Sequence, residues 1–318
     1  MKYTIGVDLG GTNIAVGLVD GESKTILRTA STKTRAPRPC KEIAEDIATL
    51  VRTLCEEEKI ALSDVEWIGI ASPGIVKENV VLFADNLGWK GKEPIAEYVS
   101  ALTGRPSYAA NDANAAAYAE ALWGAGRGVG SLVMLTLGTG VGGGIVINGA
   151  IWDGFNGFAA EIGHMIISRG GRERSCGKRG CLEAYCSATA LIRESKRIMN
   201  FYPDSLMWQK AGDSFDGVSG KTAFEAAKEG DFAARIVIED YVDALAVGVS
   251  NIINIFQPHV VVIGGGISRE GDGLMKPLCD RISRMYFGFE HNKTKILAAK
   301  FRNDAGIIGA ALLGLQNA

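Results

Sequence analysis

The sequence has little net charge and no long apolar run. Its 318 residues include 34 Lys and Arg against 36 Asp and Glu, a formal net charge of -2. So balanced a chain has no general positive field for a polyanion, which argues against nucleic acid as a partner. No apolar run approaches the ~20 residues that a membrane helix needs, and Met1-Lys2-Tyr3 leads straight into a strand pattern without a signal peptide. We therefore expect a cytoplasmic protein with neither a nucleic-acid nor a membrane partner.

Cysteine and the common nucleotide-binding motifs are also scarce or missing. The six cysteines are too few for a disulfide scaffold in a chain of this length, and we expect them to be thiols. There is no GxxxxGK[ST] phosphate loop and no GxGxxG that opens a helix. Walker-type and Rossmann-type nucleotide sites are therefore disfavoured.

Glycine, by contrast, is abundant: 41 of 318 residues, or about 13% where about 7% is usual. The glycines cluster in two stretches that read alike, residues 8–21 and 136–149, where Leu9 matches Leu137 and Gly10 matches Gly138. Each stretch is a polar turn between β-branched strands, which predicts a hairpin whose tip exposes backbone N–H groups. The spacing of about 128 residues indicates a weak internal duplication and, with the length, about two domains.

These hairpins are candidate phosphate cradles. A triphosphate needs several N–H donors at close range and a metal that offsets its charge, and residues 8–12 and 136–140 fit that need. Gly264 to Gly266 offer a third glycine surface for a nucleotide. Each stretch alone could be only a tight turn, but together in duplicated hairpins they favour phosphate binding.

Periodicity predicts the elements that surround these turns. We expect helices over 41–58, 113–122, 232–256 and 305–315, and strands over 67–71, 108–110 and 260–263. Polar clusters follow the strands at residues 72–74 and 111–112, and open α/β sheets bind ligands at such strand ends. The last apolar helix has no strand after it and must pack on elements already formed.

Asp112 is the candidate general base. A carboxylate at the end of a strand can accept a proton from an attacking hydroxyl, as in kinases. Asp is also a good N-cap for the helix that follows, so its position alone leaves both interpretations open.

Glu161, His164 and Glu183 form a candidate sugar site, because carboxylates and imidazoles fit the adjacent hydroxyls of a polyol. His164 could also be a hydrogen-bonded core histidine, which is the more common role of a single histidine. With Cys176 and Cys181 it also suggests structural zinc, but a closed site needs four ligands and only three are present. The basic residues 169, 172, 174, 178 and 179 read as a solvated loop face.

The order and spacing of these motifs resemble the ROK family of bacterial sugar kinases over essentially the whole chain. The resemblance is carried by Asp8 to Thr12, Ser72-Pro73-Gly74, Asn111-Asp112, Leu137 to Gly144, Glu161 to His164, Cys176 to Glu183 and Gly264 to Gly266. It implies an α/β, two-lobed actin-like ATPase (ribonuclease H-like) fold with duplicated βββαβαβα domains around a central cleft. The implied domains are a small lobe over 1–115, completed by a C-terminal helix at 303–318, and a large lobe over 116–302.

The resemblance also implies roles for individual residues. Asp112 is similar to the family's catalytic base, and the sugar would be bound by Gly74, Asn86, Asn111, Asp112, Glu161, His164 and Glu183. ATP and Mg²⁺ would be bound by Asp8, Gly10, Gly11, Thr12, Asn13, Thr136, Gly138, Thr139, Gly140, Gly265 and Gly266. The family's zinc loop reads Cys-x-Cys-Gly-x-x-Gly-Cys, and Arg174 stands here at the first cysteine position, so zinc held by His164, Cys176 and Cys181 stays an open question.

The resulting hypothesis is ATP-dependent phosphorylation of the 6-hydroxyl of glucose. Glucose-type aldohexoses are favoured, with N-acetylmannosamine, N-acetylglucosamine, fructose and allose as rivals. A sugar-sensing repressor would carry a DNA-binding domain ahead of this fold, and only seven residues precede Asp8. In an actin-like or chaperone ATPase, Glu161, His164 and Glu183 would have no sugar to bind, so these residues argue against that class of protein. The family resemblance implies a homodimer or higher homo-oligomer.

Overall fold

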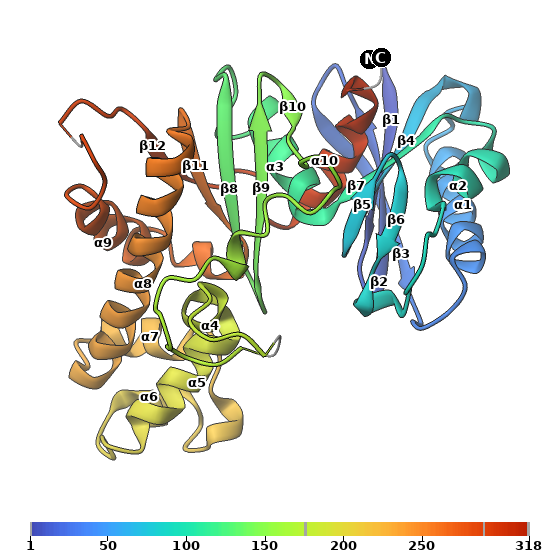
Figure 1. Ribbon diagram of the computed structural model, residues 1–318. Helices are drawn as coiled ribbons and strands as arrows, with labels where there is room; N and C mark the ends of the chain where they lie inside the picture. Colours follow the sequence, from blue (N-terminus) through green and yellow to red (C-terminus); the bar gives the residue numbers. More distant parts are fainter. Residues whose placement is uncertain (1, 175–176, 289, 317–318) are drawn as a thin grey trace. The chain divides into compact units, whose positions relative to one another are not determined.

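The computed structural model describes residues 2–174, 177–288 and 290–316. The strands are β1 (Tyr3–Leu9), β2 (Asn13–Asp20), β3 (Thr25–Lys33), β4 (Val65–Ser72), β5 (Ile75–Lys77), β6 (Val80–Phe83), β7 (Ser107–Asn111), β8 (Ser131–Leu137), β9 (Val141–Ile147), β10 (Ala150–Ile151), β11 (Val260–Gly264) and β12 (Lys295–Ala298). The helices are α1 (Cys40–Glu57), α2 (Ile95–Thr103), α3 (Asp112–Leu122), α4 (Glu183–Cys186), α5 (Ala188–Met199), α6 (Leu206–Lys210), α7 (Thr222–Lys228), α8 (Phe232–Phe256), α9 (Asp272–Ile282) and α10 (Ala305–Leu312) (Figure 1).

Two five-stranded sheets share one topology. The first has the order β3-β2-β1-β4-β7 and the second β10-β9-β8-β11-β12. In the first sheet β1 pairs with β2 antiparallel and with β4 parallel, and β4 pairs with β7 parallel. In the second, β11 lies parallel to both β8 and β12. The repeat of hairpin strands followed by two parallel strands confirms the duplication that the glycine-rich stretches predicted.

Contacts between Cα atoms divide the chain into two compact units. The first contains residues 1–131, 144–160 and 303–318, and the second contains 132–143 and 161–302. The predicted domain boundary at residue 115 stays a prediction, and the contact division keeps residues 116–131 with the first unit.

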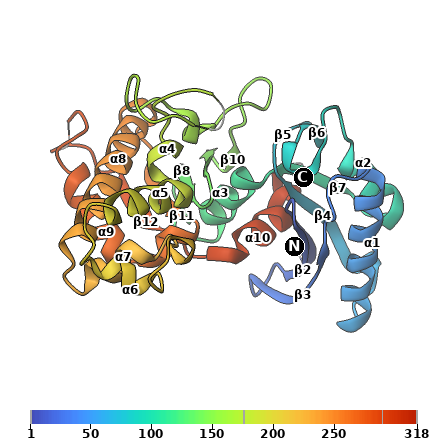
Figure 2. The same cartoon turned by 90° about the horizontal axis from the view of Figure 1, so that it is seen from below.

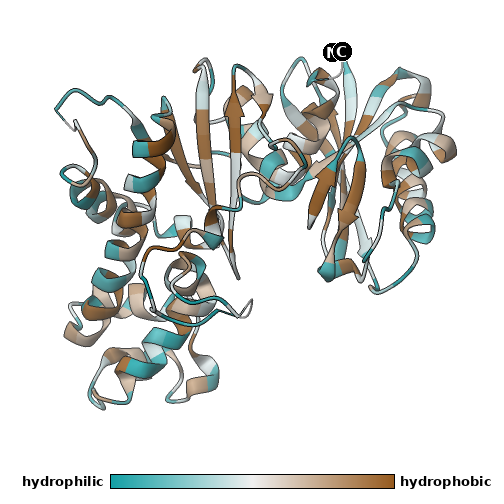
Figure 3. Cartoon of the chain, viewed as in Figure 1, coloured by the Kyte–Doolittle hydropathy of each residue, from teal (hydrophilic) through white to brown (hydrophobic). Residues whose placement is uncertain are grey.

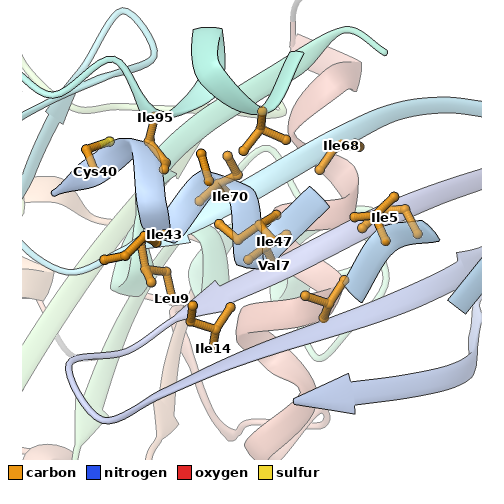
Figure 4. Packing of buried hydrophobic residues seen from close by; sticks show 14 of the residues in the cluster. Ile5, Val7, Leu9, Ile14, Cys40, Ile43, Ile47, Ile68, Ile70 and Ile95 are labelled. Carbon is orange, nitrogen blue, oxygen red and sulfur yellow. The ribbon is translucent and has the colours of Figure 1, made fainter. Parts of the chain in front are cut away.

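The core of the first unit lies between its sheet and α1. Ile5, Val7 and Leu9 alternate along β1 and are buried, and they share a cluster with Ile43 and Ile47 of α1 (Figure 4). Alternation at period 2 along the strand and at period 3.6 along the helix gives each element one apolar face. Figure 3 shows hydrophobic residues along much of the strands, in keeping with sheets that are covered by helices.

The other face of this sheet is covered by α10. Three glycines, Gly17, Gly6 and Gly69, stand side by side on neighbouring strands. A Cβ at Gly6 would lie 1.8 Å from the carbonyl oxygen of Ile307, and one at Gly69 would lie 1.7 Å from that of Ala310. The absence of side chains in this row therefore lets the helix backbone lie directly on the strands, and Figure 2 shows α1 and α10 on opposite sides of them.

In the second unit α8 is the central helix. It has the predicted bounds, and α4, α5, α7 and α9 contact it. A Cβ at Gly248 would lie 2.7 Å from a methyl carbon of Leu182, so a glycine in the middle of α8 admits the segment that leads into α4. None of the helices in the described ranges is both long and apolar enough to cross a membrane.

Candidate active site

In the first unit, Asn111 and Asp112 lie where β7 ends and α3 begins. The N-cap of α3 is Asn111, whose Oδ1 accepts hydrogen bonds from the backbone N–H groups of Ala113 at 3.0 Å and Asn114 at 3.1 Å. Asp112 is the first residue of the helix, and its side chain is exposed. The sequence left open whether Asp112 caps the helix or presents a carboxylate to a ligand. The structure places the N-cap at Asn111, and Asp112 Oδ1 also accepts a hydrogen bond from the N–H of Ala113 at 2.8 Å, so one carboxylate oxygen of Asp112 contacts the helix start as well.

Asn111 also ties this helix start to the turn after β4. Its Nδ2 donates a hydrogen bond to the carbonyl oxygen of Gly74 at 2.9 Å. Gly74 has a φ of +86°, and a Cβ there would lie 2.0 Å from the carbonyl oxygen of Phe83, so only glycine fits. Two of the predicted sugar-binding residues are thus brought together, and both ends of the Asn111 amide bind the protein itself.

The first glycine-rich turn lies beside Asn86, another predicted sugar residue. A Cβ at Gly11 would lie 2.9 Å from the carbonyl oxygen of Asn86. The turn is held by a hydrogen bond from the N–H of Gly10 to the carbonyl oxygen of Asn13 at 2.9 Å, and Thr34 Oγ1 donates to the carbonyl oxygen of Gly10 at 2.6 Å. The predicted phosphate turn and a predicted sugar residue therefore meet within one unit.

Asp8 lies at the base of this turn, close to the start of α10. A Cβ at Gly306 would lie 2.7 Å from the carboxylate, and burial raises the pKa of Asp8 above its ordinary value. A raised pKa means that the surroundings compensate the negative charge incompletely. A divalent cation would supply that compensation, so the residue fits the magnesium role that the resemblance implies.

Because the negative charge of Asp8 is incompletely compensated, Asp8→Asn should make the protein more stable and less active. Because the folded pKa is above the unfolded one, ionisation of Asp8 destabilises the fold as the pH rises above about 4. At pH 7.5 the ligand-free variant should therefore melt at a higher temperature than the wild-type protein, and it should lose Mg²⁺-dependent turnover. Asp20→Asn is the control, since a backbone hydrogen bond from Glu22 lowers the pKa of Asp20 and that variant should melt lower. A fall in melting temperature for Asp8→Asn as large as that of the control would contradict this interpretation.

In the second unit, the hairpin tip at residues 138–140 lies beside the start of α5. Ala188 donates its N–H to the carbonyl oxygen of Gly138 at 2.7 Å, and Thr189 Oγ1 donates to that of Thr139 at 2.9 Å. Gly265, with a φ of +83°, packs against this strand, because a Cβ there would lie 2.5 Å from the backbone of Leu137. A Cβ at Gly266 would have no atom within 4 Å among the described residues other than those of adjoining residues. The hairpin tip that follows Thr136 of β8 therefore lies beside the glycines that follow β11. Both segments were predicted to bind the nucleotide.

The predicted sugar residues of this unit also meet at the hairpin. Glu183 Oε2 accepts a hydrogen bond from the N–H of Val141 at 2.9 Å. A Cβ at Gly163 would lie 2.1 Å from the carbonyl oxygen of Val141, which places the turn of Glu161 and His164 on the same residue. The distance from Glu161 Oε2 to His164 Nε2 is 3.7 Å. Carboxylates and an imidazole in this arrangement can accept and donate hydrogen bonds to neighbouring hydroxyls.

Comparisons with known proteins identify the family of this chain. The model of the ROK family matches residues 4–317. The chain belongs to the ROK family. This confirms the resemblance that the order of the motifs predicted.

Several similar proteins carry the name glucokinase. The chain is 38% identical over 309 residues to a glucokinase of Thermotoga maritima, covering 96% of this chain and 95% of that one. A glucokinase of Streptomyces coelicolor is 34% identical, with 99% and 98% covered. The crystal structure of a ROK family glucokinase from Streptomyces griseus in complex with glucose and AMPPNP has a TM-score of 0.82 and 37% identity, with 99% of each chain covered. The predicted α/β actin-like ATPase fold is thereby confirmed.

The zinc loop is where this ROK chain departs from the pattern. Cys176 lies outside the described residues, and within them no group of three or more His, Cys, Asp or Glu side chains is arranged to hold a metal. The guanidinium of Arg174 contacts His164, with Nη1 2.8 Å from each ring nitrogen. A permanent cation at the nitrogens that would ligate zinc does not fit a metal centre. The zinc site stays a prediction that the observed contacts do not support.

Arg174 is the site residue that sequence reasoning missed. The basic residues 169–179 were expected to be a solvated face, but the side chain of Arg174 is only 15% exposed and is paired with Glu183. Arg172 is also engaged, with Glu194 at 3.0 Å and Asp240 at 2.9 Å. Burial and, next, the charge of Arg174 lower the pKa of His164, so the imidazole is neutral at pH 7.

Proposed function

We propose that this ROK protein transfers the γ-phosphoryl group of ATP to the 6-hydroxyl of glucose. One observation carries the kinase assignment: an exposed carboxylate, Asp112, stands at the carboxyl end of a parallel strand while its neighbour Asn111 caps the helix. Glucose and ATP as the substrates are supported by the full-length similarity to glucokinases, including one solved with glucose and AMPPNP.

Asp112 is the proposed general base. The oxygen of the 6-hydroxyl attacks the γ-phosphorus, the bond from that phosphorus to the β–γ bridging oxygen breaks, and ADP leaves. The hydroxyl proton passes to the Asp112 carboxylate. The nucleophile is the sugar itself, so no covalent enzyme intermediate forms.

The glycine-rich turns are proposed to bind the phosphates. The N–H groups of Gly10 and Gly138 close the two turns, and other backbone N–H groups of the turns would donate to phosphate oxygens at close range, because glycine has no Cβ in the way. Asp8 would hold Mg²⁺, which offsets the negative charge of the phosphates when it is bound. Gly265 and Gly266 would lie against the nucleoside.

Sugar recognition is assigned to Gly74, Asn86 and Asn111, and to Glu161, His164 and Glu183. The neutral imidazole and the carboxylates would each bind particular hydroxyls, and a hexose with the wrong configuration would leave one of these groups without its hydrogen-bond partner. Such an unpaired group costs ~1–3 kcal/mol, or about 5- to 150-fold in selectivity.

An ADP-release screen tests the substrate directly. The purified protein would be assayed with ATP and Mg²⁺ against glucose, mannose, fructose, allose, N-acetylglucosamine and N-acetylmannosamine. We expect glucose to give the highest kcat/KM, at least about 10-fold above the N-acetylhexosamines. A higher value for an N-acetylhexosamine would keep the kinase assignment and refute the substrate. Equal ADP release without any sugar would refute the kinase assignment. The homo-oligomeric state stays a prediction. Light scattering of the same preparation measures the mass of the particle and so tests it.

A further inference from the structure

The loop between His164 and Glu183 contains one side chain that joins three segments of the second unit. Arg174 Nε donates a hydrogen bond to Glu183 Oε1, and Arg174 Nη1 lies 2.8 Å from both ring nitrogens of His164. The other oxygen of Glu183 accepts from the N–H of Val141 at 2.9 Å. One guanidinium and one carboxylate thus connect the start of α4, the turn at His164 and the tip of the β8–β9 hairpin.

This pair is well shielded from water. The side chains of Arg174 and Glu183 are 15% and 18% exposed. Hydrogen bonds between charged partners are about twice as strong as neutral ones, and the planar fork of an arginine fixes the orientation of the group that it binds. The carboxylate is also confined on its other side, because a Cβ at Gly140 would lie 2.6 Å from Glu183 Oε2. Its position is therefore set jointly by the arginine and by the hairpin.

We propose that Arg174 is a positioning residue that does without metal what a zinc ion would do in this loop: it holds Glu183 and His164 in place for the sugar. The inference rests on the proposed function and deepens it. The guanidinium, with Nη1 2.8 Å from both ring nitrogens, occupies the space that a metal ion bound to the imidazole would need, so one excludes the other. The charge that fixes the sugar-binding carboxylate is part of the chain and cannot be removed by a chelator.

The expected kinetic signature is a change in KM rather than in kcat. Without Arg174 the Glu183 carboxylate has no fixed cationic partner and His164 has no fixed neighbour, while Asp112 lies on another element of the first unit. Arg174→Ala should raise the KM for glucose about 10- to 100-fold, the loss expected for a charged hydrogen bond that orders a binding group. The kcat at saturating glucose should change less than about 5-fold. Arg174→Lys keeps the charge but not the planar guanidinium, and its KM for glucose should lie between those of the wild-type protein and Arg174→Ala.

Arg172→Ala is the matched control. Arg172 lies in the same loop, binds Glu194 and Asp240, and stacks over the ring of Tyr185 with its guanidinium carbon 4.7 Å from the centroid. In the part of the chain that the structure describes, its side-chain contacts are with Glu194, Asp240 and Tyr185, and not with the predicted sugar residues. Its removal should lower the melting temperature and leave the KM for glucose within about 2-fold of wild type.

The experiment combines metal content, melting and kinetics on the full-length protein. We expect the wild-type protein, purified in buffers with zinc, to hold well below one zinc per chain, and 1,10-phenanthroline to change neither its melting temperature nor its KM. One tightly bound zinc per chain whose removal raises the KM would overturn the inference, and so would a wild-type KM in Arg174→Ala. A wild-type protein that fails to phosphorylate glucose would refute the proposed function. The zinc content and the melting temperature do not depend on turnover, so they would still test whether Arg174 takes the place of zinc. If Arg174→Ala does not fold, Arg174→Lys supplies the same comparison of KM with kcat.

Discussion

Asp112→Ala should lower kcat for glucose phosphorylation by about 100-fold or more and leave glucose binding unchanged. General base catalysis contributes about 10²- to 10⁴-fold, and no other carboxylate of α3 stands at the helix start. The variant loses the hydrogen bond from the N–H of Ala113 to Asp112 Oδ1 at 2.8 Å, but Asn111 is the N-cap, and the N–H groups of Ala113 and Asn114 keep their hydrogen bonds to its side chain. We therefore expect a melting temperature close to wild type, which separates the loss of a proton acceptor from a loss of structure.

Asp272→Ala is the matched control for this substitution. Asp272 is also the first residue of an 11-residue helix, α9, and its side chain is 79% exposed. It should retain full kcat. Glucose binding is measured by calorimetry without nucleotide, and kcat by coupled ADP release. An Asp112→Ala variant that keeps more than a few per cent of the wild-type kcat would contradict the proposed role.

Gly69→Ala should destabilise the protein by about 3 kcal/mol or more, the upper range for overpacking a filled site. The new Cβ would lie 1.7 Å from the carbonyl oxygen of Ala310. Backbone cannot rotate away as a side chain can, so α10 must shift from the sheet. Urea unfolding measures the difference in the free energy of unfolding.

Two other glycines calibrate this prediction. At Gly17 a Cβ would meet the Cγ2 methyl of Ile307 at 2.5 Å, the end of a side chain, so Gly17→Ala should cost less than Gly69→Ala. Gly91 has nothing within 4 Å of an added Cβ, and Gly91→Ala should be neutral. The order Gly69, Gly17, Gly91 in decreasing cost is the expected result. A Gly69→Ala variant as stable as Gly91→Ala would show that α10 does not lie on this row of glycines.

Local patterns in the sequence predicted the elements that flank the site. The helix at 232–256 was predicted with its observed bounds, and the helix predicted at 41–58 is Cys40–Glu57. Both have apolar residues at helical spacing over many turns, which makes the signal strong. The two hairpins were predicted because turn glycines between β-branched strands depend only on neighbouring residues.

Features that depend on long-range register could not be predicted in this way. The side-by-side row of Gly6, Gly17 and Gly69 exists only once β1 pairs with both β2 and β4. The contact of Arg174 with Glu183 depends on how an irregular loop folds back on α4, and a basic residue in a glycine-rich loop usually means a solvated face. Which of Asn111 and Asp112 caps α3 depends on a shift of one residue in the helix start, which is within the usual error of a predicted boundary.

The most direct test of the proposed function is the stoichiometry of the wild-type reaction. Glucose 6-phosphate, detected with a dehydrogenase specific for it, and ADP would be measured in the same reaction with Mg²⁺, ATP and glucose. We expect one glucose 6-phosphate for each ADP, and formation of both products at least about 100-fold slower when Asp112 is replaced by alanine. ADP that forms without glucose 6-phosphate, or equal amounts of product from the alanine variant, would contradict the assignment of this chain as a glucose kinase with Asp112 as its base.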